Sequence, residues 1–345
     1  MKRRGRLLGA AGAGLALRAG AADAAPLAVL QRPAVVTPLA SGAALLAAAR
    51  AGSRIVVAGE RGIVLFSDDG GQRWMQAQVP VQVSLTALRF ADGRNGLAAG
   101  HLGVLLRTAD GGASWALQLD GVRAAQATLD AAGDEPQRKH AQRLVAEGPD
   151  KPLFDIDIDT TGNKALAVGA YGLAFESTDG STWQSIAQRL PNARHLHLYA
   201  VRSVGERVFV AGEQGLLLRS VDRGASFEPL ASPYKGSFFG LLAARSGTLI
   251  VYGLRGNAFR STDFGASWTA VNTGAAVSIS AGVQHDDGAL LLLAQNGDLL
   301  ISRDDGQRFE RRPAAPPFPA AALAVAGRGL VLAGLRGVRR VEAAA

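Results

Sequence analysis

The sequence predicts an all-β fold, a seven-bladed β-propeller whose blades are four-stranded antiparallel sheets. A short apolar stretch recurs with steps of 41, 69, 43, 41, 41 and 40 residues. Six of the seven copies continue into an Asp- and Gly-rich turn that an aromatic residue closes. A repeat of about 40 residues is the length of one propeller blade. The stretches end at Gly59, Gly100, Gly169, Gly212, Gly253, Ala294 and Gly334.

Composition supports a packed globular chain and excludes several kinds of site. Of the 345 residues, 48% are apolar and 19% are charged, so a sizeable core can form. The absence of cysteine excludes disulfides, thiolate metal sites, a Cys nucleophile and a lipid-bearing Cys. The formal net charge is +8, and residues 1–25 carry half of it. The remaining basic residues are scattered, so we expect no nucleic-acid partner.

Residues 1–25 have the layout of a secretory signal peptide. Basic residues from Met1 to Arg6 precede an apolar run, Leu7 to Leu17, and the small-x-small sequence Ala22-Asp23-Ala24 follows. The apolar run is shorter than the roughly 20 residues that a spanning helix needs. We therefore expect export to the periplasm, with the general secretory and twin-arginine routes both open. The alternative is a disordered tail on a cytosolic protein.

The propeller is expected over residues 33–345. In its second blade the predicted strands, from the centre outward, are Leu85–Ala91, Leu97–Gly100, Val104–Thr108 and Ser114–Leu119. The last unit supplies only three strands. We expect Pro33–Leu39 to add the fourth and so close the ring, because an unpaired edge is a liability. Trimming residues 35–37 would then destabilise the whole ring.

The recurring turns are expected to be structural. The Asp carboxylate can accept backbone N–H groups of the turn, and the preceding Ser or Thr hydroxyl can add a bond. The closing aromatic fills the gap between neighbouring blades. We assign no catalytic, metal or cofactor role to these residues, and expect no cofactor. They are Asp69, Asp110, Asp179, Asp222, Asp263, Asp304, Trp74, Trp115, Trp183 and Trp268.

The turn pattern S/T-x-D-x-G-x-x-W/F resembles the Asp-box, or BNR, repeat of sialidases and sortilin-type receptors. Combined with the Ala-Gly-Glu-x-Gly turns at Gly59 and Gly212, it resembles the photosystem II stability/assembly factor family (Ycf48-like). That resemblance implies a docking or assembly protein that binds a membrane-protein client. The client is a photosystem II intermediate in photosynthetic relatives, and another envelope complex or transporter elsewhere. The cyanobacterial form is a lipoprotein, from which this cysteine-free chain departs.

The order of strands separates two faces of the ring. The Asp boxes connect the third and fourth strands of a blade, so they share one face with the first-to-second turns. The opposite face, called the docking face below, holds the second-to-third turns and the links between blades. Its candidate partner-binding residues are Glu60, Arg61, His101, Tyr171, Glu213, Arg255, Arg336, His195 and His197. His195 and His197 alternate, but with no third ligand nearby we expect no metal.

The 69-residue step adds an insertion over residues 120–151, also on the docking face. Residues 122–131 and 135–146 are predicted to form two helices. Either the helices cap the channel mouth and dock a partner, or they pack down passively.

An enzyme on this face is the alternative to a docking protein. A sialidase needs an arginine triad, an assisted Tyr nucleophile and an Arg-Ile-Pro sequence, and the last is absent. Glu60 and Glu213 could serve a glycosidase only if their carboxylates lay close together. We therefore predict a non-enzymatic monomer, peripheral to the membrane at most, with sialidase-like hydrolysis or carbohydrate binding as the alternative.

Overall fold

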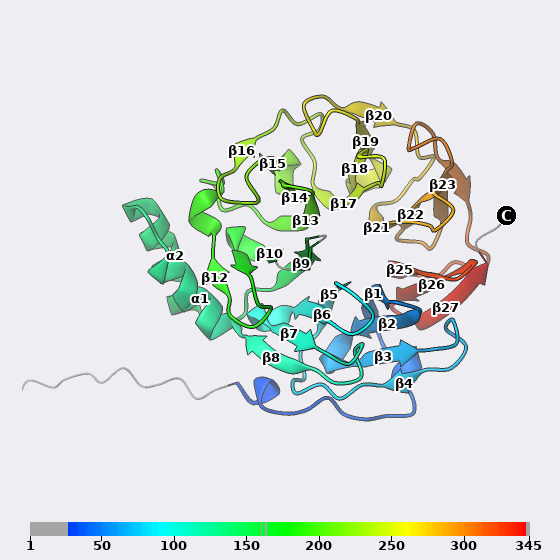
Figure 1. The fold of residues 1–345 in the computed structure, drawn as a ribbon, viewed down its shortest axis with the longest axis horizontal. Helices are drawn as coiled ribbons and strands as arrows, with labels where there is room; N and C mark the ends of the chain where they lie inside the picture. The colour runs from blue at the N-terminus through cyan, green and yellow to red at the C-terminus, as the bar shows by residue number, and fades with distance from the viewer. Residues whose placement is uncertain (1–26, 160, 163, 343–345) are drawn as a thin grey trace, which may run out of the picture.

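The computed structural model describes residues 27–342 apart from 160 and 163. Seven antiparallel sheets stand around a ring, which confirms the predicted propeller (Figure 1). The first three sheets are blade 1, with β1 (Leu45–Ala51), β2 (Arg54–Gly59), β3 (Val64–Ser67) and β4 (Met75–Gln76); blade 2, with β5 (Leu85–Phe90), β6 (Gly96–Gly100), β7 (Leu105–Thr108) and β8 (Ala116–Leu119); and blade 3, with β9 (Leu153–Ile158), β10 (Ala165–Gly169), β11 (Ala174–Ser177) and β12 (Gln184–Ser185).

The remaining sheets follow the same order, except that the last has three strands. They are blade 4, with β13 (Leu198–Val204), β14 (Arg207–Gly212), β15 (Leu217–Ser220) and β16 (Glu228–Pro229); blade 5, with β17 (Phe238–Ala243), β18 (Leu249–Gly253), β19 (Ala258–Ser261) and β20 (Thr269–Val271); blade 6, with β21 (Ile279–Gln284), β22 (Leu290–Ala294), β23 (Leu299–Ser302) and β24 (Glu310–Arg312); and blade 7, with β25 (Ala320–Ala326), β26 (Gly329–Gly334) and β27 (Gly337–Glu342).

The core lies between the blades. The second strand of each blade is an apolar run buried on both faces, as in β22 (Leu290–Ala294). The described core divides into clusters that each join neighbouring sheets, for example Val56 of blade 1 with Leu106 of blade 2. Each Å² of apolar surface buried in these interfaces contributes about 25 cal/mol of stability, which holds the ring together.

Each Asp box is a network of local hydrogen bonds. In blade 2, Thr108 Oγ1 donates to Asp110 Oδ1 at 2.8 Å, and the N–H of Ser114 donates to the same oxygen at 3.0 Å. Trp115 is buried against blade 1, and its Nε1 donates to Gly112 O. In blade 5, the hydroxyl and N–H of Ser267 bond to the Asp263 carboxylate and lower its pKa to about 2.

The expected closing strand does not form. Residues 33–39 are irregular, and blade 7 keeps three strands. This segment runs instead along the outside of blade 1, where Thr37 N donates to Gln76 Oε1 and Gln76 Nε2 donates to Val35 O. The prolines at positions 33 and 38 lack N–H donors, which disfavours a ladder. The seam between blades 7 and 1 is therefore closed by packing, Leu45 and Ile55 lying with Val331.

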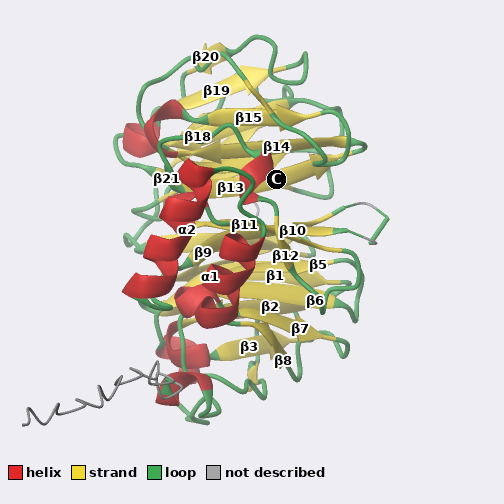
Figure 2. Cartoon of the chain, turned by 90° about the vertical axis from the view of Figure 1, so that its left-hand side faces the viewer, coloured by secondary structure: helices red, strands yellow, loops and turns green. Residues whose placement is uncertain are grey.

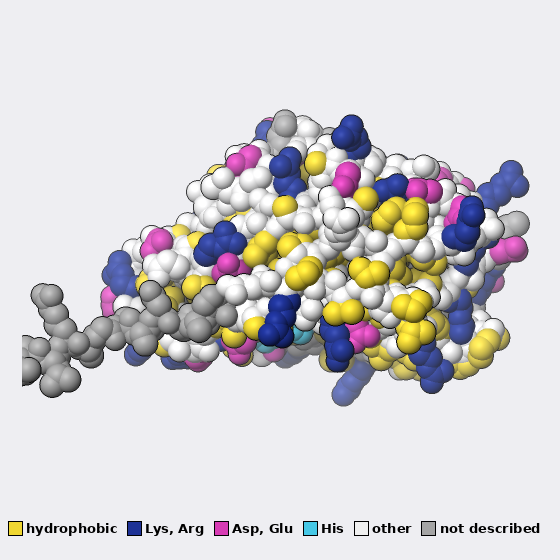
Figure 3. All heavy atoms as spheres, turned by 90° about the horizontal axis from the view of Figure 1, so that it is seen from below, with side chains coloured by type: hydrophobic (Ala, Val, Ile, Leu, Met, Phe, Trp, Pro, Cys, Tyr) yellow, Lys and Arg dark blue, Asp and Glu magenta, His cyan; other side chains and the backbone are white. Residues whose placement is uncertain are grey.

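The outer edge of blade 1 exposes apolar side chains. Figure 3 shows hydrophobic side chains gathered among Lys and Arg when the ring is seen from this edge. The large apolar residues that residues 27–39 and β4 expose include Val35, Val36, Leu39 and Met75. Hydrogen bonds hold residues 33–39 in place: besides the two bonds to Gln76, Ala34 N donates to Val79 O and Gln82 Nε2 donates to Pro33 O.

Two helices form the insertion between blades 2 and 3, as predicted. They are α1 (Gly121–Asp130) and α2 (Glu135–Glu147). The side chains of Asp120 and Asp134 cap their N-termini. Figure 2 shows the helices and the helical second-to-third turns along one face of the ring, which is the docking face.

The proposed signal peptide, residues 1–25, lies outside the described residues. In the part that is described, neither α1 nor α2 is long and apolar enough to cross a membrane.

Candidate functional site

Five of the seven second-to-third turns present one residue in a fixed, strained conformation. The middle residue of five of these turns has a left-handed backbone although it is not glycine. Such a conformation costs about 1 kcal/mol for an L-residue. In blade 1 it is held by Ile63 N, which donates to Glu60 O, and by Gly62, where a Cβ would lie 2.0 Å from Val81 O. These presented residues are Arg61, Leu102, Tyr171, Gln214 and Arg255.

The two glutamates of the docking face are tied to their own blades. Glu60 Oε1 accepts from Ala44 N at 2.9 Å, and Glu60 N donates to Ala44 O. Glu213 forms the same reciprocal pair with the backbone of His197. The carboxylates hold the chain where it enters β1 and β13, in blades 1 and 4. The structure does not pair them with each other, so it gives the glycosidase alternative no geometry.

Tyr171 lies at the centre of a histidine and aromatic cluster. Its backbone N–H donates to His197 Nδ1 at 2.9 Å, and the two rings meet edge to face with centroids 4.9 Å apart. Its carbonyl contacts His140 Nε2 at 3.0 Å. Since a carbonyl only accepts, His140 carries a proton on Nε2. The Tyr171 side chain is left 44% exposed above this support.

His140 joins the insertion to the propeller. Its ring, on α2, stacks on that of His195 with centroids 3.5 Å apart and an interplanar angle of 2°. Burial lowers the pKa of both histidines, and their mutual charge lowers that of His195 further. The stack therefore holds neutral rings near pH 7. His140 is a contact that sequence reasoning missed, because only the fold brings α2 beside residues 187–195.

A hollow of about 590 Å³ opens beside this cluster. Its lining comes from the insertion, from the Tyr171 turn and from the link between blades 3 and 4. The polar groups that it offers include Asp134, Gln137, His140, Arg189, Asn192 and His195. This volume is within the range of small-molecule and peptide side-chain sites.

His195 and His197, two residues apart in the link between blades 3 and 4, make separate contacts. His195 stacks on His140, whereas His197 bonds to Tyr171. Within the described residues no group of three His, Asp or Glu side chains is placed to hold a metal ion.

The other candidate residues are dispersed around the docking face. Arg61 and Arg336 are exposed on the neighbouring blades 1 and 7, and Arg255 is exposed on blade 5. His101 is exposed on blade 2. The residue before Arg336, Leu335, is 62% exposed. The structure therefore presents separated cations, with Leu335 exposed beside Arg336, rather than one dense basic patch.

Polar links that the sequence did not reveal join the innermost strands. Asp157 accepts from Arg89 of blade 2 at 2.8 Å and from Ser203 N of blade 4 at 2.7 Å. Asp155, two residues earlier on β9, pairs with Arg202. The alternation Phe-Asp-Ile-Asp-Ile is the only sequence signal for them. These carboxylates hold blade 3 between its neighbours.

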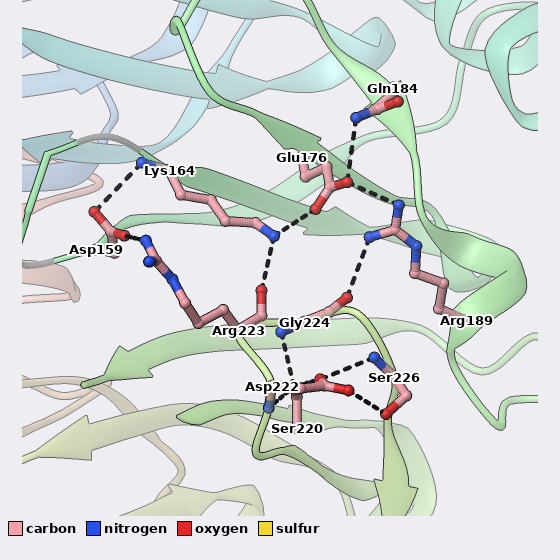
Figure 4. A network of polar contacts seen from close by, with 10 residues as sticks. All are labelled: Asp159, Lys164, Glu176, Gln184, Arg189, Ser220, Asp222, Arg223, Gly224 and Ser226. Atoms are coloured by element: carbon pink, nitrogen blue, oxygen red, sulfur yellow. Dashed lines mark hydrogen bonds and ion pairs between the residues drawn. The ribbon is translucent and has the colours of Figure 1, made fainter. Parts of the chain in front are cut away.

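A second polar network joins blades 3 and 4 near the Asp-box face, which lies opposite the docking face (Figure 4). Glu176 is buried and forms ion pairs with Lys164 at 2.7 Å and with Arg189 at 2.8 Å. Burial would raise the pKa of Glu176, but these two cations hold it below its ordinary value. Lys164 also donates to Arg223 O, and Arg189 to Gly224 O. The same Arg189 lines the hollow beside Tyr171, so this network fixes one wall of the candidate site.

The fold and the site define a class: an Asp-box propeller that carries a helical insertion and presented side chains on one face. The family described as photosynthesis system II assembly factor YCF48 matches residues 137–314, a little over half of the chain, and the protein belongs to this family.

Known proteins agree with that assignment. The photosystem II assembly lipoprotein Ycf48 of Synechococcus sp. (strain CC9902) is 23% identical over an alignment of 181 positions that covers 47% of this chain and 53% of the relative. The chain thus spans about half the length of this curated relative in the match.

Solved propellers share the fold. A structure of YCF48 bound to D1 peptide has a TM-score of 0.64 at 16% identity, covering 90% of this chain and 96% of that one. YCF48 from Cyanidioschyzon merolae has a TM-score of 0.62 at 15% identity, covering 88% and 96%. The WD40 propeller domain of Doa1 reaches 0.64 at 9% identity, covering 91% and 96%, so the likeness of shape alone is not specific to the family.

Proposed function

We propose that this protein is a non-catalytic assembly factor that docks a membrane-protein client on its docking face. Family membership supports an assembly role, and one structural relative is described as bound to a D1 peptide. The client proposed here is an envelope membrane complex: photosystem II in a photosynthetic cell, or another envelope complex or transporter elsewhere.

The observation that carries this proposal is the way Tyr171 is held. An aromatic side chain that is 44% exposed stands on a backbone fixed by His197 and by His140, beside a hollow of about 590 Å³. A rigid exposed aromatic next to a hollow is the usual form of an interface anchor. Because little side-chain or backbone freedom is lost on binding, such an anchor contributes more of its contact energy.

Charge and apolar surface around the anchor suit a protein client. Arg61, Arg255 and Arg336 would meet acidic side chains or backbone carbonyls at the rim, and Leu335 would bury apolar area there. The insertion would add to the docking surface the wall of the hollow that His140 lines. We propose that the helices are part of the docking surface and not a passive elaboration.

The proposed location is the periplasmic surface of a membrane. Residues 1–25 would direct export, and the mature propeller would act as a monomer that is peripheral to the membrane at most. The absence of cysteine in the chain leaves no thiol for a lipid anchor.

The test is a pull-down from envelope membranes of the native cell with full-length protein. The triple charge reversal R61E/R255E/R336E should lose the client that the wild type recovers, and Y171A should weaken it. A matched control, R94E/R308E/R328E, reverses three exposed arginines in turns of the opposite face and should keep the client. Recovery of the same client by both triple variants would show that the docking face is not the binding surface.

A further inference from the structure

Blade 7 has an open outer edge. Six blades end in a fourth strand, but β27 is the last strand of its sheet and lies at the outside of the ring (Figure 1). An edge strand directs alternate N–H and C=O groups away from its sheet. Among the described residues no further backbone hydrogen bond is made by β27 beyond its ladder with β26. The ring therefore contains one position for an added strand.

Part of that edge is already covered. A Cβ on Gly337 would lie 1.9 Å from Ser41 O, so the start of β27 is packed against the turn that precedes β1. The remainder runs from Arg339 to Glu342. Arg339 is occupied: its guanidinium donates to Pro316 O at 2.7 Å and lies over the Phe318 ring. Arg340 is exposed and has no side-chain hydrogen bond or ion pair within the described part of the chain.

The register of blade 4 provides a model for an added strand on blade 7. Arg340 pairs with Val331, three residues before the glycine that ends the second strand. Arg219 has the same position in blade 4, where it pairs with Phe209. In that blade the fourth strand is present, and Glu228 lies directly opposite Arg219 with their side chains 2.6 Å apart. Arg107 of blade 2 and Arg260 of blade 5 have the same position, but they lie opposite Ala116 and Thr269. Blade 4 therefore shows that an acidic residue fits opposite this arginine, as one of the partners that the register admits.

Charge disfavours two occupants supplied by the chain itself. Two copies of β27 paired antiparallel about Arg340 would bring the two Arg340 side chains face to face, and like charges on facing strands are unfavourable. Residues 1–25 carry five basic residues and one acidic residue, so their charge is also unsuitable. Residues 33–37 are held by Gln76 elsewhere.

We propose that the edge of β27 from Arg339 to Glu342 binds an extended acidic segment of a partner protein as a fourth strand. An Asp or Glu of that segment faces Arg340 in the way that Glu228 faces Arg219. Main-chain bonds supply most of the affinity, and the charge pair sets the preference for acidic sequence. This site is separate from the docking face and does not depend on the function proposed above.

The probe is a labelled, end-capped peptide of about seven residues that alternates Val and Glu, which is long enough for one strand. Two control peptides replace the Glu residues with Lys, or the central Val with Pro. Binding to the full chain is measured by fluorescence anisotropy. The Glu peptide should bind about tenfold more tightly than the Lys peptide. The Pro peptide should also lose affinity, because Pro removes a main-chain donor.

Reversing the charge at position 340 tests the role of Arg340. R340E should lose the Glu peptide and gain the Lys peptide, whereas R328E, an equal charge change in the β25–β26 turn of the same blade, should bind as the wild type does. Hydrogen exchange of residues 337–342 should slow when the Glu peptide is added. Equal binding of the Glu and Lys peptides to the wild-type chain would overturn the proposal. So would protection confined to other residues, or a dimer of the free chain that protects β27.

Discussion

The backbone N–H of Tyr171 donates to Nδ1 of His197 at 2.9 Å, so a turn of blade 3 is fastened to the link that leads into blade 4. His197 in turn is held by Glu213, whose carboxylate accepts from its N–H. Two residues that the sequence suggested as contacts for a partner therefore also support the residue that faces the partner.

Replacing His197 with Ala should loosen the Tyr171 turn. The N–H of Tyr171 loses its acceptor, and the edge-to-face contact of the two rings is lost. We expect a loss of about 1–2 kcal/mol in the free energy of unfolding, measured by urea denaturation. H101A, which truncates the exposed histidine of the blade 2 turn, should change it by less than about 0.5 kcal/mol. If the two variants lower the free energy of unfolding equally, His197 does not stabilise the Tyr171 turn.

Stability should fall as the pH drops below the ordinary histidine value. The folded-state pKa of His140 and of His195 lies below 6.5 because burial disfavours the charged ring. Between 6.5 and that lower value the unfolded chain binds more protons than the folded chain, so acidification favours unfolding. The groups facing the stack include Arg143, which lowers both pKa values, and Glu147, which opposes this for His140.

The measurement is urea denaturation at several values of pH between 7.5 and 5. In H140Q the dependence should shrink, since Gln cannot titrate and the charge on His195 no longer meets a second cation. The Asp-box carboxylates Asp69 and Asp263 titrate in a separate, more acidic window, because hydrogen bonds within the turn lower their pKa values. If the free energy of unfolding of the wild type does not change between pH 7.5 and 5, the stacked histidines do not titrate as proposed.

The number of blades could be predicted from the sequence because each repeat contains the residue pattern of its own strands and turns. The Asp-box turn at Ser67–Trp74 is local, so its residues are adjacent in the chain. The closing strand was predicted wrongly because that prediction relied on counting strands. The count ignored the side chain of Gln76, which binds residues 35–37 to blade 1 instead. Likewise, the stacking of His140 on His195 depends on where an insertion folds back, which no local pattern determines.

Removing an Asp-box carboxylate should destabilise the ring measurably. Asp110 accepts bonds from Thr108 Oγ1, Ser114 N and Ser114 Oγ, all within one turn. Hydrogen bonds to a charged acceptor contribute about 1.5–3 kcal/mol each in favourable sites, and partial exposure reduces this. We expect D110A to lose about 2 kcal/mol in chemical denaturation. E206A, which removes an exposed carboxylate in the turn before β14, should stay within about 0.5 kcal/mol of the wild type.

The seam between blades 7 and 1 can be tested at a glycine. Gly337 has φ 86°, and an added Cβ would lie 1.9 Å from Ser41 O. Gly327, in the β25–β26 turn, has φ 60° but no heavy atom within 4 Å of the same added Cβ. The left-handed conformation alone costs an Ala residue about 1 kcal/mol, so G327A should lose about that much stability.

G337A should cost more than G327A, because the clash must also push the turn before β1 away from β27. Overpacking of this kind adds about 1–3 kcal/mol, so we expect unfolding free energies that differ by at least about 1 kcal/mol. If the two variants are equally stable, the contact of Ser41 with β27 does not close the ring. Packing among Leu45, Ile55 and Val331 would then have to carry the seam alone. If G337A is the weaker of the two, this contact takes over the part that a paired fourth strand performs in the other blades.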